Sequence, residues 1–249
     1  MRVILKILSA ALLCYLTIFF FYVARLYEAF AHTDIVISRY KEPMDYLNNP
    51  IFQSFRKIYL YNKGPTLDSN IVLPENVEIL TLPNVGCEGH TYLHHIIHNK
   101  ETLADKILFL PGSWFYTSNK QKAVVAIIQS ISHHDFSALG HLHEHTVYER
   151  FQDFSLDTYQ HTHISNVNPS ASLAHCQDRP YGVWYEKNFS NRQSYITTYN
   201  GIFLTSSARI KANPPQLYEN LISYLDNDRN PEAGHFMERS WAVVFNPCA

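Results

Sequence analysis

Hydrophobic and polar positions divide the chain into one long apolar segment and a series of shorter alternating segments. Residues 3–23 are almost wholly apolar, and no charged residue occurs from 7 to 24. At 1.5 Å of rise per residue, a helix of this length crosses most of a bilayer core of about 30 Å. The pattern therefore predicts one transmembrane helix at the N-terminus.

Charged residues on either side of this segment indicate its orientation. Arg2 and Lys6 precede it, and Arg25 follows it with Glu28 nearby. Because positive charge tends to stay on the cytosolic side, these flanks favour a cytosolic N-terminus and a type II signal anchor. Residues 29–31, Ala-Phe-Ala, have the small-x-small pattern of a cleavage site, which is the alternative. We therefore expect a single-pass membrane protein of the Golgi or endoplasmic reticulum, or else a protein secreted after signal-peptide cleavage.

Either interpretation places the chain from residue 32 onward in an oxidising lumen or outside the cell. We expect residues 1–31 to form a cytosolic tip, the membrane anchor and a short stem, and residues 32–249 to form one luminal domain. Asn188 begins the sequon Asn-Phe-Ser and is the predicted glycosylation site. Cys87, Cys176 and Cys248 permit one disulfide, and their spacing fits no Cys-x-x-Cys zinc or redox motif.

The rest of the pattern alternates between strand and helix periodicity. β-branched and apolar runs bounded by turn residues predict strands, and apolar residues at intervals of three and four predict helices. The predicted strands are 34–38, 57–61, 77–82 and 107–110, and the predicted helices are 92–104, 123–131 and 217–225. This order predicts an α/β fold with a mainly parallel sheet and flanking helices, whose ligands bind beyond the carboxyl ends of the strands.

Two regions depart from this regular order. Residues 195–199 and 202–205 both have strand character, and Asn200-Gly201 between them predicts a β-hairpin because both residues tolerate a positive φ. Residues 133–180 have little periodicity and are rich in His, Asp, Ser and Asn. We interpret this stretch as a long insertion or the rim of a site.

Composition narrows the class of protein. Hydrophobic residues make up 46% of the chain and charged residues 17%, against about 25% charged residues in an average soluble domain. This balance favours a packed globule over disorder. The formal net charge of -2 disfavours a basic nucleic-acid platform.

Five ordered blocks of the luminal part resemble a known family. They are residues 35–40 (Ile-Val-Ile-Ser-Arg-Tyr), 59–64 (Tyr-Leu-Tyr-Asn-Lys-Gly), 82–86 (Leu-Pro-Asn-Val-Gly), 88–96 (Glu-Gly-His-Thr-Tyr-Leu-His-His-Ile) and 234–241 (Gly-His-Phe-Met-Glu-Arg-Ser-Trp). Together they resemble the domain of unknown function 3431. That family is in turn distantly similar to nucleotide-sugar-dependent glycosyltransferases of the GT-A type, so the resemblance implies a single GT-A-like domain.

The resemblance also implies a set of substrate-binding residues. The first strand and the turn after it hold the nucleotide in GT-A enzymes, which implies that the donor lies beside Arg39, Tyr40, Asn62 and Lys63. The block at 88–96 implies that the central cleft contains Glu88, His90 and Thr91. Cys87 occupies a position that is often basic in the family.

One departure from the GT-A pattern concerns the metal. The strand at 107–110 corresponds to the one that delivers an Asp-x-Asp motif, yet it is followed by Pro111-Gly112-Ser113-Trp114. Mg²⁺ or Mn²⁺ lacks its usual carboxylate ligands there, so no metal ligand is assigned and a divalent cofactor is not supported. The charge of a diphosphate would instead need Arg39, Lys41, Lys63 or helix-terminal amides.

Near the C-terminus, a helix over residues 234–241 places His235, Glu238 and Trp241 on one face. Glu238 is the predicted catalytic base, which removes a proton from an acceptor hydroxyl as that hydroxyl attacks an anomeric carbon. His235 is the second predicted catalytic residue. Either His235 or Arg239 would stabilise the charge of the leaving diphosphate. The alternative is a structural pair of Glu238 and Arg239 with Trp241 in the core.

Histidines form two further groups. His90, His94 and His98 are spaced by four, so a helix aligns them on one face, but no His-Glu-x-x-His motif occurs. His141, His143 and His145 alternate, and residues 133–134 and 161–163 add four more histidines nearby. A polar helix face and a His-rich polar loop are favoured over metal sites because nothing closes either set into a coordination geometry.

The leading hypothesis is a glycosyltransferase-like protein of the secretory pathway that transfers a sugar from a nucleotide donor to a glycan or glycoconjugate. Its expected partners are the membrane, a nucleotide sugar and a glycan acceptor, with no nucleic acid. The alternative is a non-catalytic, membrane-anchored glycan-binding or accessory protein that keeps the fold without the metal site. A third hypothesis is a His-dependent metalloprotein. Enzyme activity therefore stays open at this point.

Overall fold

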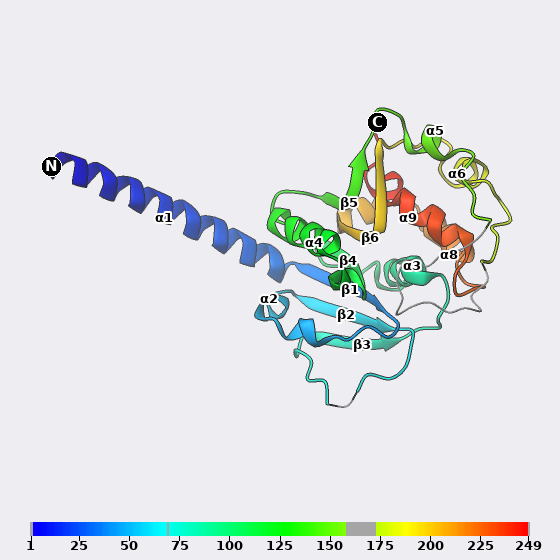
Figure 1. Ribbon diagram of the computed structural model, residues 1–249, viewed down its shortest axis with the longest axis horizontal. Coiled ribbons are helices and arrows are strands. Elements are labelled where there is room, and N and C mark those ends of the chain that lie inside the picture. Colours follow the sequence, from blue (N-terminus) through cyan, green and yellow to red (C-terminus); the bar gives the residue numbers. More distant parts are fainter. Residues whose placement is uncertain (1, 69, 158–172, 249) are drawn as a thin grey trace.

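A mixed sheet organises the protein, whose computed structural model describes residues 2–68, 70–157 and 173–248 (Figure 1). Within these ranges six strands lie in the order β3-β2-β1-β4-β6-β5. Their bounds are β1 Thr33–Arg39, β2 Lys57–Asn62, β3 Val77–Thr81, β4 Lys106–Pro111, β5 Phe136–Leu142 and β6 Ile196–Ser206. The four strands predicted from periodicity are β1 to β4, so that prediction is confirmed.

Strand direction sets the position of the ligand-binding edge. β1, β2, β3 and β4 are parallel, and β6 is antiparallel to both β4 and β5. The chain moves outward from β1 through β2 to β3 and then returns to the other side of β1 as β4. In open α/β sheets this reversal leaves a crevice beyond the carboxyl ends of the two central strands, which here are β1 and β4.

Helices cover both faces of the sheet. The longer ones are α1 Arg2–Ala31, α3 Cys87–Asn99, α4 Ser118–Ser130, α6 Tyr181–Phe189, α8 Pro215–Ser223 and α9 Glu232–Phe245, and the shorter ones are α2 Pro50–Gln53, α5 Val147–Phe151 and α7 Ser207–Lys211. Side chains alternate along β1, so that Val36 packs with α3, α8 and α9 while Ile35 and Ile37 pack with α2, α4 and the end of α1. Two apolar layers therefore enclose the sheet.

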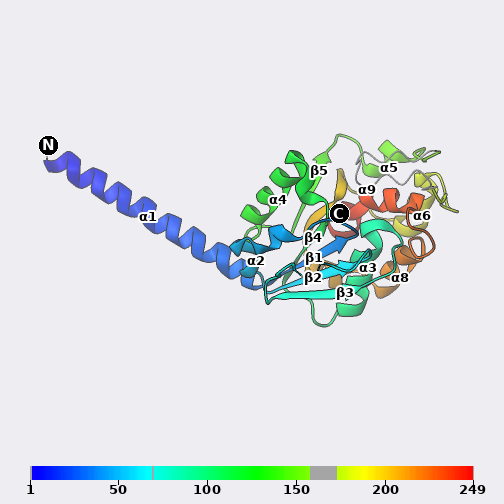
Figure 2. The same cartoon turned by 60° about the horizontal axis from the view of Figure 1, so that its bottom comes forward.

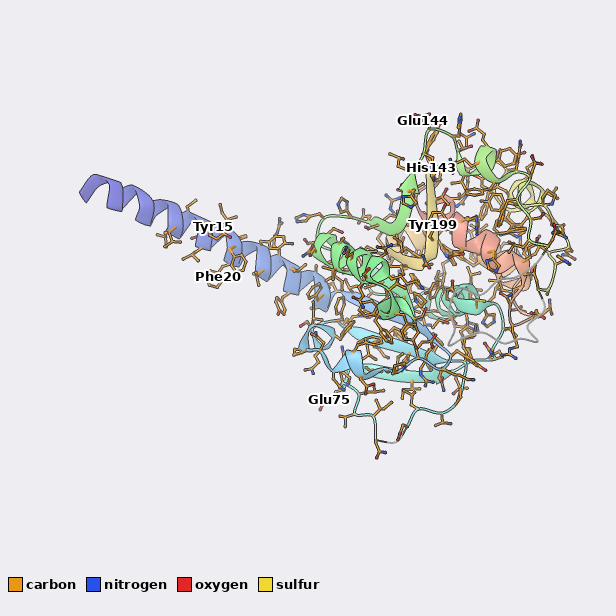
Figure 3. The ribbon with its side chains drawn as sticks, in the orientation of Figure 1. Tyr15, Phe20, Glu75, His143, Glu144 and Tyr199 are labelled. Atoms are coloured by element: carbon orange, nitrogen blue, oxygen red, sulfur yellow. The ribbon has the colours of Figure 1, made fainter. Side chains whose placement is uncertain are left out.

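The N-terminal helix α1 continues almost directly into β1. Thr33 Oγ1 donates a hydrogen bond to the Ala29 carbonyl at 2.7 Å, and the buried Phe30 ring stacks on Phe55 with 4.6 Å between centroids. Among the described residues, one helix is long and apolar enough to cross a membrane, over Leu12–Ala31. Figures 1 and 2 show α1 projecting away from the sheet, and Figure 3 shows Tyr15 and Phe20 on this projecting part.

The hairpin predicted at Asn200-Gly201 is wrong. Both residues have positive φ, 58° and 59°, yet the chain does not reverse and β6 continues from Ile196 to Ser206. The pairing with β5 shifts register between Ala138 and Gly140, opposite this point. Two left-handed residues in succession therefore make a kink in one long strand rather than the turn between two strands.

Two other expectations need correction. Residues 133–180 are not a structureless insertion, because they include β5 and α5. β5 escaped the periodicity analysis because it is an edge strand whose residues are only half-buried or exposed, so apolar alternation is weak. The sequence also predicts a helix from Pro43 to Leu47, because proline favours the first turn of a helix. The structure instead has a 3₁₀ turn over Asp45–Asn48, followed by α2. His161 and His163, which belong to the second group of histidines, lie outside the described residues.

Candidate functional site

The candidate site lies where β1 and β4 end, at the position where open α/β sheets have their crevice. The Gly112 amide after β4 donates a hydrogen bond to the Ser38 carbonyl at 2.6 Å, and Ser38 Oγ lies 2.9 Å from Thr91 Oγ1 on α3. These contacts hold the N-terminal half of α3 against both strand ends. Glu88 in the first turn of α3 therefore lies beside the crevice.

Two glutamates converge on the kink in β6 from different helices. Glu238 on α9 accepts a hydrogen bond from the Asn200 amide at 2.6 Å through Oε1, and Thr198 Oγ1 donates to the Glu238 carbonyl at 2.6 Å. A Cβ added to Gly201 would lie 2.7 Å from Glu88 Cγ, so Glu88 packs directly on the Gly201 backbone. The Glu238 side chain keeps 23% of its surface exposed. Glu238 thus binds Asn200, the first residue of the kink, and Glu88 packs on Gly201, the second.

Burial and charge act together on Glu88. Burial raises the pKa of this carboxyl, and the neighbouring Glu238 charge raises it further, while Lys120 and His235 partly oppose the shift. A nearby like charge in a partly desolvated site favours the protonated form, which is the direction of the shift at Glu88. Lys120 also reaches Ser113 Oγ at 3.5 Å after β4.

Lys63 closes the side of the crevice next to β2. Its ammonium group donates hydrogen bonds to the carbonyls of Val85 and Cys87 at the start of α3. Burial lowers the pKa of Lys63 to about 8, and the Cys87 and Glu88 charges act in the opposite direction. Lys63 and Glu88 therefore both lie at the N-terminus of α3, with the Lys63 ammonium group bound to backbone oxygens.

Arg39 and Asn62 are placed together, but their polar groups contact the protein itself. Arg39 donates to the Glu42 carbonyl at 2.9 Å, to Asn62 Oδ1 at 2.6 Å and to the Pro65 carbonyl at 2.9 Å. Burial lowers the pKa of Arg39, with the Glu42 charge opposing it. The buried Arg39 side chain thus fixes the loops after β1 and β2, while the neighbouring Tyr40 contacts Arg229, whose Nη2 lies 3.5 Å from the Tyr40 hydroxyl.

His90 and Thr91 are buried on α3. Thr91 is fully buried, and its hydroxyl forms a hydrogen bond with the Ser38 hydroxyl. Thr91 therefore positions α3 and does not face solvent. His90 Nε2 lies 3.2 Å from Asp226 Oδ1 after α8, and burial lowers the pKa of His90 to about 4, with Lys63 and His94 adding to the effect. Both residues lie next to the crevice, in supporting positions.

Arg239 turns away from the kink toward α5. Its guanidinium lies 4.2 Å from the Phe154 ring centroid and 5.6 Å from that of Phe151, and Nη1 donates to the His235 carbonyl at 2.8 Å. The separation of Nη1 from Glu238 Oε2 is 3.7 Å. Arg239 thus forms an ion pair with Glu238 while aromatic rings hold its guanidinium, and Trp241 is buried, as the structural alternative predicts. Glu238 and His235 lie close enough to Glu88 to act on its charge.

The family assignment rests on a match that covers this entire arrangement. The model of the family described as protein of unknown function (DUF3431) matches residues 35–249, from β1 through α9. The chain belongs to this family. No curated protein matches it. The DUF3431 region therefore contains both carboxylates, the kink between them and the strands that position them.

The histidines of this DUF3431 domain line up as expected without forming a metal centre. The rings of His90, His94 and His98 follow one another along α3, with centroids 6.0 Å and 3.9 Å apart. His94 and His98 border a recess of about 510 Å³ between α3 and the β2-β3 edge, and neither Glu88 nor Glu238 lines this recess. Across the described parts of the chain, no group of three or more His, Cys, Asp or Glu side chains could hold a metal ion.

The second histidine group lies on the opposite edge of the sheet. Figure 3 shows His143 and Glu144 at the end of β5, with Tyr199 on β6 beside that strand. The His141 ring lies 5.6 Å from Tyr199 and 6.2 Å from His143 between centroids. Of these histidines, His141 lies at the end of the edge strand β5, whereas His143 and His145 lie in the loop after it, as predicted for a His-rich loop.

Asn188 and the cysteines are placed by the structure as follows. Asn188 is half-buried on α6, and its side-chain amide donates to the Trp184 carbonyl at 2.8 Å. Glycosylation at Asn188 stays a prediction.

In the described residues Cys14, Cys87, Cys176 and Cys248 are all free thiols.

A buried carboxylate that the sequence analysis missed is Glu232, the first residue of α9. Its side chain is fully buried and accepts hydrogen bonds from the amides of Leu156 at 2.6 Å and Cys176 at 2.9 Å. Arg179 Nε lies 3.2 Å from Glu232 Oε2. Glu232 therefore ties two distant chain segments to the start of α9, the helix that carries Glu238. Nothing in its local sequence separates it from a surface glutamate at a helix N-terminus.

Replacing Gly201 with Ala will disturb the pair of carboxylates. We expect a loss of about 1 to 2 kcal/mol in the free energy of unfolding, because a left-handed conformation strains an L-residue. The new Cβ would also displace Glu88, since it would lie 2.7 Å from Glu88 Cγ. Chemical denaturation of the full chain in detergent measures the loss. Asn200→Gly is the control, because Gly adopts the Asn200 conformation without strain and keeps the amide that binds Glu238; an equal loss in both variants would contradict the prediction.

Buried histidines predict a loss of stability in mild acid. Burial lowers the pKa of His90 to about 4 and that of His95 to about 3, from 6.5 in the unfolded chain. Between pH 6.5 and 4 the unfolded chain therefore binds more protons, so stability falls as the pH falls, by about 1.4 kcal/mol per pH unit for each group. Denaturation across this range measures the slope. His95→Phe will lower that slope by the contribution of one histidine, about 1.4 kcal/mol per pH unit. An unchanged slope would show that burial does not lower the pKa of His95.

Proposed function

We propose that this DUF3431 protein is a membrane-anchored glycosyltransferase of the secretory pathway, with a GT-A-like domain that transfers a sugar from a nucleotide donor to a glycan or glycoconjugate. The observation that carries the proposal is the convergence of Glu88 and Glu238 on the β6 kink, beyond the carboxyl ends of β1 and β4. This is the edge at which open α/β sheets bind ligands. The apolar helix α1 supports the anchor.

The proposed reaction is a single displacement at the anomeric carbon of the donor. The acceptor oxygen forms a bond to that carbon, and the bond from the carbon to the diphosphate oxygen breaks, so the nucleoside diphosphate leaves with the electron pair. The acceptor proton passes to the carboxylate of Glu238. The raised pKa of Glu88 suits a neighbouring carboxyl group that holds a proton and donates a hydrogen bond.

Cations near Glu88 would balance the charge of the leaving group. Lys63 lies at the N-terminus of α3 and Lys120 reaches Ser113 after β4. The residues after β4 supply no carboxylate for a divalent metal, and the nearby Glu42 carboxylate already accepts the amides of Tyr40 at 2.7 Å and Lys41 at 3.0 Å. The donor set does not fit a hard divalent ion there, so no step is assigned to one.

Donor binding tests the proposal directly. We expect a uridine or guanosine diphosphate sugar, at about 100 times its dissociation constant, to raise the melting temperature of the full chain in detergent by roughly 5 to 10 °C. The corresponding free sugar without the nucleotide is the control. If no donor of either nucleotide shifts the melting temperature, the transferase proposal fails.

A non-catalytic glycan-binding role is the second candidate, favoured by one observation. Arg39 and Asn62, expected on the donor side, direct their polar groups to each other and to loop carbonyls. A fold that has lost donor chemistry would keep such a network for stability. Replacement of Glu238 separates the two candidates, because only an enzyme depends on its carboxylate for turnover.

A further inference from the structure

The junction between α1 and the domain fixes how the domain stands on a membrane. α1 ends at Ala31 and β1 begins at Thr33, so no flexible stem separates them. The Arg56 amide donates to the Phe30 carbonyl at 3.1 Å and to the Thr33 carbonyl at 3.0 Å, which binds the domain to both sides of the junction. A bilayer that holds α1 therefore meets a defined surface of the domain.

A second contact links α1 to the domain closer to the membrane. The Tyr22 hydroxyl donates a hydrogen bond to the Gln129 carbonyl at 3.1 Å, near the end of α4. Leu26, Ala29 and Phe30 pack against the domain, so the part of α1 that is free to enter a bilayer ends near Tyr22 rather than at Ala31. Tyr22 is also three residues before Arg25, at the end of the charge-free run of residues 7–24. Tyrosine at such a position belongs to the interface between acyl chains and headgroups. Gln129 is thus held at the depth of the headgroups.

The exposed surface around Gln129 suits contact with lipid. On α4 it presents Val125, which is 52% exposed, and Ala126, and the turn after α4 presents His133 and His134. No acidic residue occurs between 118 and 134, and Lys120 and Lys122 lie earlier on the same helix. The exposed Asp135 follows this stretch directly, so negative charge lies at its border and not within it. Residues 125–134 therefore combine apolar side chains with neutral or basic ones, a composition that can rest on headgroups.

We propose that the C-terminal end of α4 and the turn after it, residues 125–134, rest on the headgroups of the bilayer that α1 crosses, as a second membrane contact. The proposal uses the anchoring role of α1 and is independent of sugar transfer. It gives the domain two points of support on the membrane, one through α1 and one through α4. Figure 1 shows α4 beside the end of α1, and both ribbon views place α6 at the opposite end of the molecule.

Depth-dependent fluorescence quenching tests this contact. The four native cysteines are replaced by alanine, and a single cysteine is introduced as Gln129→Cys or, as the control, Val183→Cys. Val183 is 49% exposed on α6, so it matches an exposed helical position far from α1. Each full-length variant carries an environment-sensitive fluorophore and is reconstituted in phosphatidylcholine vesicles that contain a lipid with a spin-labelled headgroup.

We expect the label at 129 to be quenched several-fold more strongly than the label at 183, and the two to be equal in detergent without the spin label. Equal quenching in vesicles that retain the protein would overturn the proposal. Protein that does not remain with the vesicles would overturn it as well, through failure of the α1 anchor. Donor protection measured in detergent is unaffected by either outcome, so failure here is distinct from failure of the transferase. Circular dichroism confirms that both variants fold.

Discussion

Glu238→Gln is expected, under the transferase function proposed above, to reduce sugar transfer by about 10² to 10⁴-fold, the usual contribution of a positioned general base. The substitution removes the proton acceptor while keeping the size of the side chain, and its carboxamide oxygen can still accept the Asn200 amide. The kink and α9 should therefore stay in place. Turnover of radiolabelled donor measures the loss, and donor-induced thermal protection in the same preparation shows whether binding persists.

Glu219→Gln is the matched control for this experiment. Glu219 is an exposed glutamate on α8, so the substitution makes the same chemical change without touching the kink. We expect full turnover in this variant. Retained cellular activity in Glu238→Gln would instead favour the non-catalytic, glycan-binding role. A loss of both turnover and donor binding would mean that Glu238 acts in binding rather than as a base.

Glu232→Ala will lower the free energy of unfolding by about 3 to 5 kcal/mol, the range for removing one partner of a buried ion pair. The variant leaves the amides of Leu156 and Cys176 without their acceptor and removes one of the two carboxylates that pair with Arg179, the other being Asp157. Each unsatisfied buried donor adds its own desolvation cost. Because Glu232 starts α9, we also expect the helix that carries Glu238 to lose order at its first turn.

Unfolding of the full chain in detergent, followed by tryptophan fluorescence, measures this effect. Glu232→Gln keeps one acceptor oxygen and most of the shape, so its loss should be smaller than that of the alanine variant. Glu219→Ala, at an exposed position, should change stability by no more than about 0.5 kcal/mol. A Glu232→Ala variant as stable as this control would show that the buried carboxylate is not a structural anchor.

Local pattern was sufficient for most of the sheet and helices. β1, β2 and β4 are recognisable because each is a short apolar run closed by turn residues, and each is buried on both faces. α9 is recognisable because Trp241 and its apolar neighbours recur at helical spacing. These elements form where local preference and tertiary packing agree, which is the condition under which periodicity is informative.

The site was only partly accessible from sequence, because it depends on contacts between distant segments. Glu88 and Glu238 were named as candidates, but their meeting depends on Asn200-Gly201, which indicates a hairpin when considered alone. The kink forms instead because Glu238 binds the Asn200 amide and the Tyr92 hydroxyl donates to the Gly201 carbonyl at 2.9 Å. Both contacts come from helices far away in the chain. Tertiary partners therefore decided the conformation that these two residues adopt.

The shared kink has a consequence for how substitutions combine. One carboxylate packs on Gly201 and the other binds the adjacent Asn200, so a change at either glutamate alters the backbone that supports its counterpart. Effects of residues that share a support are non-additive, with interaction energies of about 0.5 to 3 kcal/mol. Among members of this family, substitutions at Glu88, Glu238, Asn200 and Gly201 would then be expected to occur together rather than one at a time.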